Sequence, residues 1–276
     1  AVKASGDAAF PMTAAGQPEF LVVDVKMRQT FGYSYAGAFQ TTNSLQKENQ
    51  KPRGVATNAD GSVRWTVDAK GEVFVYNASG KLLGNWKFTG VDKPEGIAVL
   101  GSDLWLVDRA AMRVFYFAGG ATRLAGTTAS TSSFPLASAN RNAMDITTDG
   151  SHLWVVNEGK VDQVFRYTAA GNLEGVWQLD KANISPTGLV VDPANPSSIW
   201  VVDASKDRVF EYTDAASRLT GSLTATRSFA LQAKDTQPQG IALPMPAAAA
   251  AGTPRAASSM VASSGMSSGA ASGAAT

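Results

Sequence analysis

Few residues in this sequence are of the types that usually carry catalysis. The chain contains one histidine, His152, and no cysteine. Nucleophilic catalysis needs a base beside the nucleophile, most often histidine, and thiol chemistry needs cysteine. His152 ends the segment Asp149–His152, whose Asp, Gly and Ser are typical of a surface turn. The sequence therefore argues against a Ser-His-Asp triad, a thiol nucleophile and a metal site built from histidine or cysteine.

A carboxylate or amide recurs at five equivalent positions and forms a second candidate set. The five residues are Asp24, Asp68, Asp108, Asn157 and Asp203. Each follows an apolar segment and precedes a turn, where an Asp or Asn side chain bonds the backbone about two residues on. Because each belongs to a different repeat, the five would also lie too far apart to share one ion. We therefore expect them to hold turns.

These five residues end a signature that repeats about every 40 to 50 residues, the period typical of propeller blades. A tryptophan stands three residues before the Asp or Asn in four copies, at Trp65, Trp105, Trp154 and Trp200, and Leu21 replaces it in the first. An aromatic pair follows each copy: Phe31/Tyr33, Phe74/Tyr76, Phe115/Phe117, Phe165/Tyr167 and Phe210/Tyr212. This alternation predicts a strand with one buried face.

A Pro-x-Gly-apolar segment supplies a further strand before most copies. It occurs at residues 52–55, 94–97, 186–189 and 238–241, and 143–146 is a degenerate copy. With a fourth strand after each aromatic pair, every repeat becomes four short strands that cannot cover their own apolar faces, so neighbouring repeats must stack. The sequence therefore predicts an all-β fold, a β-propeller of about five four-stranded blades.

The two ends of the repeat region complement each other. The first repeat lacks its Pro-x-Gly strand, and the last Pro-x-Gly strand lacks its repeat. Joining them predicts a composite blade in which residues 238–243 supply the innermost strand and residues 19–50 the other three. This pairing of N- and C-terminal strands closes the ring without a free seam. Six blades remain the alternative if the chain is a fragment.

A longer period is superimposed on the blade repeat. Residues 105–134 match residues 200–229 without a gap, and residues 73–86 resemble residues 164–177. We infer that a pair of blades was duplicated and that two kinds of blade alternate. One kind has an outer strand ending in Gly-x-Trp, and the other has a longer outer segment.

The inner strands line the channel of a propeller, so their variable positions are candidate binding residues. The position before the glycine is occupied by Arg53, Glu95, Met144, Thr187 and Gln239, and Asp145 stands in the glycine position of the degenerate copy. We take Arg53, Glu95, Asp145, Thr187 and Gln239 as a candidate binding set at the channel mouth. Arg53 and Glu95 lie on adjacent blades and are expected to pair.

Several segments resemble NHL-type propeller repeats, namely residues 94–98, 104–108 and 113–115. The resemblance covers about residues 19–243. The longer pattern is similar to propeller modules of large bacterial extracellular proteins, whose last repeat also ends like Pro238–Ala242. The resemblance implies an extracellular propeller, while propellers host binding, scaffolding and catalysis alike. Glu95 is also faintly similar to the channel carboxylate with which gluconolactonase-like propellers hold a divalent cation.

Composition and charge restrict the partners. The net charge is +1, from 24 basic and 23 acidic residues, and gives no sign of a nucleic acid, an acidic membrane surface or a polyanionic substrate. No apolar run approaches the roughly 20 residues that span a bilayer. We therefore expect no nucleic-acid partner, no membrane insertion and no cofactor, with calcium as a minor alternative. The recurring tryptophans are expected to pack between blades and not to stack on sugars.

The chain ends differ from the repeat region. Residues 1–18 are interpreted as an extension, either a flexible leader or an extra strand for an exposed edge. Residues 244–276 are rich in Ala, Ser and Gly and are interpreted as a low-complexity tail or linker. The chain starts at Ala1 without a signal-peptide pattern, so we expect a removed leader or an excised piece, and an extracellular or cell-surface location.

The first functional hypothesis is a non-catalytic extracellular propeller that acts as a protein- or glycan-binding scaffold. One alternative is a self-assembling subunit of a bacterial surface layer or filament, which would associate through residues 1–18 and the tail. A second alternative is a metal-dependent lactonase-like or lyase-like enzyme.

Overall fold

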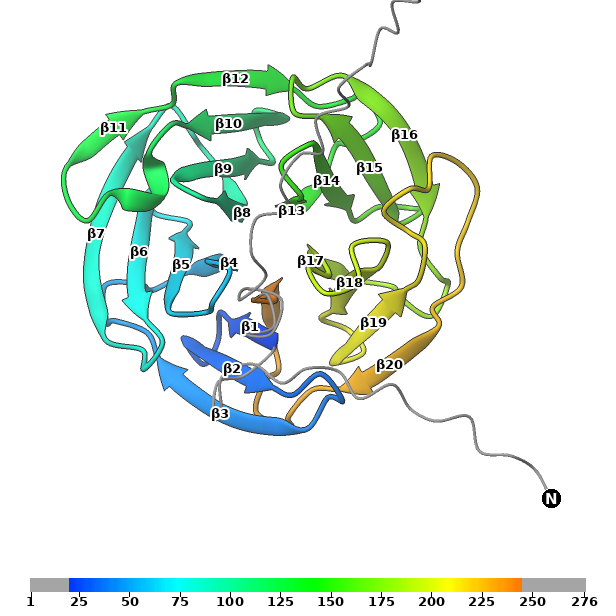
Figure 1. The fold of residues 1–276 in the computed structure, drawn as a ribbon, viewed down its shortest axis with the longest axis horizontal. Coiled ribbons are helices and arrows are strands. Elements are labelled where there is room, and N and C mark those ends of the chain that lie inside the picture. The colour runs from blue at the N-terminus through cyan, green and yellow to red at the C-terminus, as the bar shows by residue number, and fades with distance from the viewer. Residues whose placement is uncertain (1–19, 245–276) are drawn as a thin grey trace, which may run out of the picture.

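The computed structural model describes residues 20–244, in which five four-stranded antiparallel units surround a central axis (Figure 1). Each unit is one blade, and we label the blades A to E in chain order. From the axis outward, blade A contains β21 (Pro238–Ala242), β1 (Phe20–Asp24), β2 (Gln29–Tyr33) and β3 (Phe39–Ser44); blade B contains β4 (Pro52–Thr57), β5 (Val63–Asp68), β6 (Glu72–Asn77) and β7 (Leu82–Thr89); blade C contains β8 (Pro94–Leu100), β9 (Asp103–Asp108), β10 (Arg113–Phe117) and β12 (Ser132–Pro135); blade D contains β13 (Ala143–Thr148), β14 (His152–Asn157), β15 (Gln163–Thr168) and β16 (Leu173–Gln178); blade E contains β17 (Pro186–Val191), β18 (Ile199–Asp203), β19 (Arg208–Tyr212) and β20 (Arg227–Ala230). The predicted five-bladed β-propeller is confirmed.

Blade A closes the ring as the sequence predicts. Its innermost strand β21 comes from the end of the described chain and pairs antiparallel with β1 from the beginning, with Val22 opposite Ile241. The predictions for residues 1–18 and for the tail after Pro244 lie outside the described residues.

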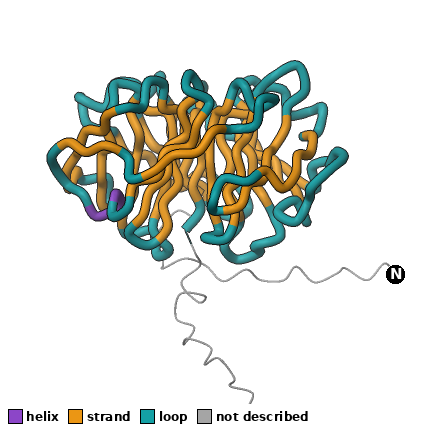
Figure 2. Tube along the Cα trace, turned by 90° about the horizontal axis from the view of Figure 1, so that it is seen from above, coloured by secondary structure: helices purple, strands orange, loops and turns teal. Residues whose placement is uncertain are grey.

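All inner strands run in the same direction, so the ring has two different faces (Figure 2). We call the face where the inner strands begin the proline face. It carries the connections between blades and the turns between second and third strands. We call the opposite face the hairpin face, which carries the turns joining first to second and third to fourth strands. Phe20 and Pro244 both lie at the hairpin face, because β1 begins there and β21 ends there.

The five recurring Asp and Asn side chains hold the proline face together. The Asp68 carboxylate accepts from Lys70 N (2.7 Å) in its own turn and from Lys51 N (2.7 Å) in the connection arriving from blade A. Asp24, Asp108 and Asp203 accept from both kinds of segment in the same way, and Asn157 accepts from the incoming connection. The predicted turn role is confirmed for the four aspartates, whereas Asn157 accepts only from the incoming connection. All five residues tie one blade to the next.

Four of the five junctions between the described blades are also closed by a tyrosine hydroxyl. Tyr76 accepts from Gln46 N (3.2 Å) and from Asn49 Nδ2 (3.3 Å). The same arrangement joins Tyr167 to Asn140 and Tyr212 to Asn183. At the junction between blades E and A an acid replaces the amide, and the Tyr33 hydroxyl donates to Asp235 Oδ2 at 2.9 Å.

The two kinds of blade fit together through the long outer segments. In blade C this segment contains a short 3-10 helix (Gly120–Thr122) and β11 (Thr127–Ala129), which pairs parallel with β7 of blade B. A side chain at Gly84 of β7 would overlap the backbone of Leu124, and Gly175 of β16 faces Leu219 in the same way. In each of the two predicted blade pairs, the long outer segment of the second blade therefore covers the outer strand of the first.

The core lies between blades. Trp65, Trp86, Trp154, Trp177 and Trp200 are buried, while Trp105 is half-buried against Tyr116. Apolar side chains of adjacent blades form shared clusters, as expected for units that cannot cover their own faces. No helix of the described residues is long and apolar enough to cross a membrane.

Candidate functional site: the two ends of the channel

The inner strands approach one another so closely that the channel is closed near the proline face. A side chain added at Gly188 would lie 2.7 Å from Gly240 Cα, and one at Gly240 would lie 2.9 Å from Gly54 Cα. Only glycine leaves room for backbones this close, which explains the glycine of the Pro-x-Gly segment. The fifth position of this ring of contacts is occupied by Asp145 beside Gly96.

The Asp145 side chain fills the centre of the ring. It is 1% exposed, and its two carboxylate oxygens accept from Ile146 N (2.9 Å) and Leu189 N (3.0 Å). The backbone N–H groups of Ile97 and Ile241 are also directed to it, so four blades contribute donors. Burial raises the pKa of this carboxyl well above its ordinary value, and the four N–H groups act against that rise. Asp145 therefore acts as a plug bonded to the backbone of the surrounding blades.

Charged side chains surround the proline-face mouth. Arg109 Nη2 lies 2.8 Å from Glu95 Oε1, and Arg53 Nε lies 3.5 Å from Glu95 Oε2. Arg53 Nη1 also donates to Gln239 Oε1 at 2.9 Å, which links blades A, B and C. The predicted Arg53–Glu95 pair is present. Burial raises the pKa of Glu95, whereas the two guanidinium groups lower it.

The structure brings only part of the predicted binding set together. Arg53 contacts both Gln239 and Glu95. Thr187 lies apart from them, and its hydroxyl donates to Pro238 O (2.8 Å). Asp145 is buried within the ring of glycines. The set accordingly satisfies much of its own hydrogen-bonding capacity. Its role in binding stays a prediction. Sequence reasoning missed Arg109, because it lies in the turn after β9 and outside the Pro-x-Gly segments.

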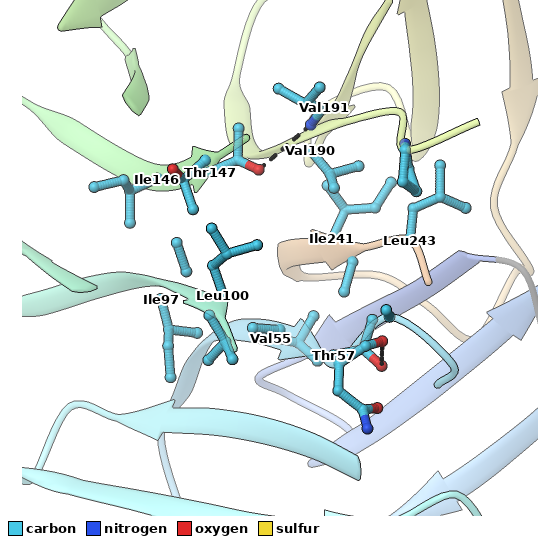
Figure 3. Close-up of a pocket in the computed structure, with 18 of the residues that line it drawn as sticks. Val55, Thr57, Ile97, Leu100, Ile146, Thr147, Val190, Val191, Ile241 and Leu243 are labelled. Carbon is cyan, nitrogen blue, oxygen red and sulfur yellow. Dashed lines mark hydrogen bonds between the residues drawn. The ribbon is translucent and has the colours of Figure 1, made fainter. Parts of the chain in front are cut away.

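The channel opens as a funnel on the hairpin face. The cavity has a volume of about 540 Å³ and is lined by all five inner strands. Figure 3 shows side chains from different blades around this space, among them Val55, Ile97, Ile146, Val191 and Ile241. We call this cavity the apolar funnel. The ring of glycines and Asp145 closes it below, so it is open only at the hairpin face.

Polar groups in the funnel are few, and the structure already uses several of them. Thr57 Oγ1 donates to Val63 O (3.1 Å), and Thr147 Oγ1 accepts from Val191 N (3.4 Å). Each inner strand is also the edge strand of its sheet, so one row of its backbone polar groups faces the axis. This funnel leaves only a weak signal in the sequence, because its lining residues resemble ordinary buried strand residues.

Other groups offer little for metal or nucleophilic chemistry. The described residues contain no group of three or more His, Cys, Asp or Glu side chains that could hold a metal ion. His152 Nε2 lies 2.8 Å from Arg166 Nη2, and its Nδ1 lies 3.3 Å from Asp149 Oδ2. These contacts place the single histidine in a charged surface network with the turn that the sequence predicts.

Comparison with known proteins identifies the fold. No protein-family model matches this chain, and no curated protein matches its sequence. The likeness to NHL-type repeats therefore stays a resemblance. Among solved structures, the chain is similar to one in a nidogen/laminin complex, with a TM-score of 0.54 and 12% identity, over 82% of this chain and 98% of that one.

A second similar structure is a candidate 6-phosphogluconolactonase from Bacteroides uniformis. Its TM-score is 0.45 at 14% identity, over 77% of this chain and 66% of that one. The first likeness, at 12% identity, concerns the fold and not the activity. The strand order of the five sheets defines the class, a five-bladed β-propeller.

Proposed function

We propose that this chain is a non-catalytic extracellular β-propeller that binds a protein partner at its hairpin face. The observation that carries the proposal is the apolar funnel, whose volume of about 540 Å³ lies in the range of specific binding cavities. An apolar anchor side chain of a partner fits such a cavity, and buried anchors of this kind supply most of the binding energy at interfaces.

The rest of the hairpin face supports the same partner. Among residues 20–244, six of the nine exposed large apolar side chains lie at the hairpin end of their blades, mostly on the outer strands: Phe39, Leu83, Leu100, Leu124, Leu173 and Leu219. The loops of this face carry only three exposed acids and three exposed bases: Asp60, Asp149, Asp214, Lys81, Arg123 and Arg218. An apolar centre within a weakly charged face is typical of protein interfaces.

A protein partner is favoured over a glycan because the tryptophan rings are packed against other side chains. Sugar recognition by stacking needs an accessible aromatic face, and five of the six tryptophans are buried between blades. Trp105 is half-buried and packs against Tyr116 at 5.2 Å between ring centroids.

A non-catalytic role is favoured because the channel carboxylates are already engaged. Glu95 is neutralised by Arg53 and Arg109, and Asp145 accepts from the backbone. The lactonase-like alternative requires Glu95 to hold a divalent ion. Calcium binding that is lost in Glu95→Gln would revive that alternative, and no bound ion at millimolar calcium would end it.

The binding proposal is tested by filling the funnel. Peptides selected against the wild-type protein from a displayed library are measured for affinity to wild type, to Val99→Trp inside the funnel, and to Val161→Trp on the proline face. We expect apolar peptides whose affinity falls at least tenfold for Val99→Trp and less than twofold for Val161→Trp. Failure to select any peptide, or equal affinity for all three proteins, would overturn the proposal.

A further inference from the structure

The exposed charge of this protein is distributed unevenly between its two faces. The loops of the proline face carry eleven exposed cationic side chains: Lys26, Arg28, Lys47, Lys51, Lys70, Lys93, Arg141, Lys160, Lys181, Lys206 and Lys234. The same loops carry three exposed acids, Glu48, Asp92 and Asp207. The hairpin-face loops carry three of each sign. We call the proline-face set of eleven the cationic face.

Much of the compensating negative charge lies below this surface, and Glu158, Asp162 and Asp180 in the same loops are half-buried. Asp24, Asp68, Asp108 and Asp203 are at most 1% exposed and accept hydrogen bonds from the backbone of the turns above them. An external partner therefore meets the lysines first, although the whole chain has a net charge of only +1. The net charge of the chain therefore does not reveal this positively charged surface, because the lysines are exposed and these four aspartates are buried beneath them.

Apolar side chains project from the same loops. Met27, Val161 and Ile184 are 38%, 47% and 50% exposed. Met27 stands between Lys26 and Arg28, and Val161 directly follows Lys160. Met27 lies in blade A, Val161 in blade D and Ile184 in the connection from D to E, so the three are spread over the part of the ring that blades D, E and A form (Figure 1).

We propose that the proline face is a peripheral docking surface for an anionic lipid bilayer. Lysines around the whole ring suit a flat and diffuse array of negative headgroups, to which each contributes as a point charge. Met27, Val161 and Ile184 would enter the boundary between headgroups and acyl chains beside those lysines, as apolar side chains do at membrane interfaces.

The composition of the surface favours lipid over a nucleic acid or a soluble polyanion. Nine of its eleven cations are lysine and two are arginine, whereas bidentate recognition of phosphate uses arginine. Interleaved apolar tips would add nothing to a linear polyanion in water. The first and last described residues, Phe20 and Pro244, lie at the opposite face.

Vesicle co-sedimentation of the full chain tests the proposal. The vesicles contain phosphatidylcholine alone or with 30% phosphatidylserine. We expect binding only to the anionic vesicles, with a loss of at least tenfold between about 50 and 300 mM salt. No binding to anionic vesicles, or equal binding to both kinds, would overturn the proposal.

Two triple variants with the same change in net charge separate the faces. Lys181→Glu/Lys206→Glu/Lys234→Glu should weaken vesicle binding at least tenfold. Lys81→Glu/Arg123→Glu/Arg218→Glu on the hairpin face should weaken it less than threefold. Equal losses would show that net charge acts and not the proline face, and would overturn the assignment.

A third variant separates a bilayer from a soluble polyanion. Met27→Ser/Val161→Ser/Ile184→Ser should weaken vesicle binding at least threefold and leave retention on heparin unchanged, whereas Phe39→Ser/Leu83→Ser/Leu173→Ser should alter neither. Vesicle binding unaffected by loss of the three apolar tips would identify a polyanion surface instead. Thermal unfolding of each variant confirms that it is folded. The peptide affinities of the hairpin face are independent of all these outcomes.

Discussion

The two faces of the ring are built from the same strands but are held together by different forces. At the proline face, side-chain hydrogen bonds cross almost every blade junction, through the Asp and Asn turns, the tyrosine hydroxyls and the Arg53–Glu95–Arg109 cluster. At the hairpin face, the inner strands surround an apolar funnel, and fewer side-chain hydrogen bonds join blades, namely those from Tyr35 to Asp192, from Trp65 to Ala121 O and from Arg166 to Ala216 O. Polar connections are therefore more numerous at the end where the channel is closed.

This difference follows from chain direction. The segment leaving one blade and the first residues of the next meet at the proline face, so backbone groups of irregular segments gather there and need partners. The hairpin turns satisfy their own backbone groups locally, as Asn58 does in its turn. More of the polar contacts between blades accordingly lie at the proline face, and the opposite face carries the cavity.

The largest expected effect comes from the plug between the two ends. The two carboxylate oxygens of Asp145 accept from Ile146 N and Leu189 N. In Asp145→Asn an NH2 group replaces one of these oxygens, so one of the two backbone N–H groups faces another donor. We expect a loss of about 3 kcal/mol in the free energy of unfolding, since a buried donor is left without an acceptor. Urea unfolding at pH 7 measures it. An unchanged midpoint would show that the carboxyl is already protonated and donates.

The junction between blades E and A offers a sharper test, because its acid has amide counterparts at three other junctions. Burial raises the pKa of Asp235 to about 8, and the nearby Asp24 and Asp207 charges add to the rise. The folded pKa lies above the unfolded one, so this group's contribution is complete below about pH 4 and is lost as the pH rises towards 8. Tyr33 is the hydroxyl that donates to it.

Asp235→Asn should remove this loss. We expect the variant to gain up to about 4 kcal/mol relative to wild type between pH 5 and pH 8, since the slope is about 1.4 kcal/mol per pH unit at most over three units. Urea unfolding at both pH values measures the gain, with Asn49→Asp at an equivalent junction as the converse variant. Parallel stability profiles of wild type and Asp235→Asn would contradict the assignment.

The mouth cluster is expected to matter less, because its arginines are partly exposed. Glu95→Gln leaves Arg53 and Arg109 without their carboxylate, and we expect a loss of about 1–2 kcal/mol after allowance for solvent screening. Asp149→Asn removes a carboxylate from the hairpin face and should cost less than about 0.5 kcal/mol. Chemical denaturation of both variants measures the difference, and equal losses would remove the contrast between the faces.

Periodicity made the architecture and part of the site predictable from sequence. The recurring Trp, Asp and Pro-x-Gly positions determine the blades, the closing blade A and the residues around the proline-face mouth. Arg109 and the funnel were not predicted, since the first lies outside the repeat pattern and the second depends on the spacing of five backbones. The cationic face left an overlooked signal: Lys51 and Lys93 directly precede the inner-strand prolines, and Lys70 follows Asp68 by two residues.

The smallest expected effect on stability is at the rim of the funnel and completes the comparison. Leu100 ends β8 and is 45% exposed, so Leu100→Ser removes little buried surface and should change the free energy of unfolding by less than about 0.5 kcal/mol. Affinity for a selected apolar peptide should nevertheless fall several-fold, because Leu100 lines the funnel. Isothermal titration and urea unfolding of the same preparation measure both quantities. A loss of stability without a loss of affinity would assign this rim to folding. It would contradict the proposal that the hairpin face serves binding more than stability.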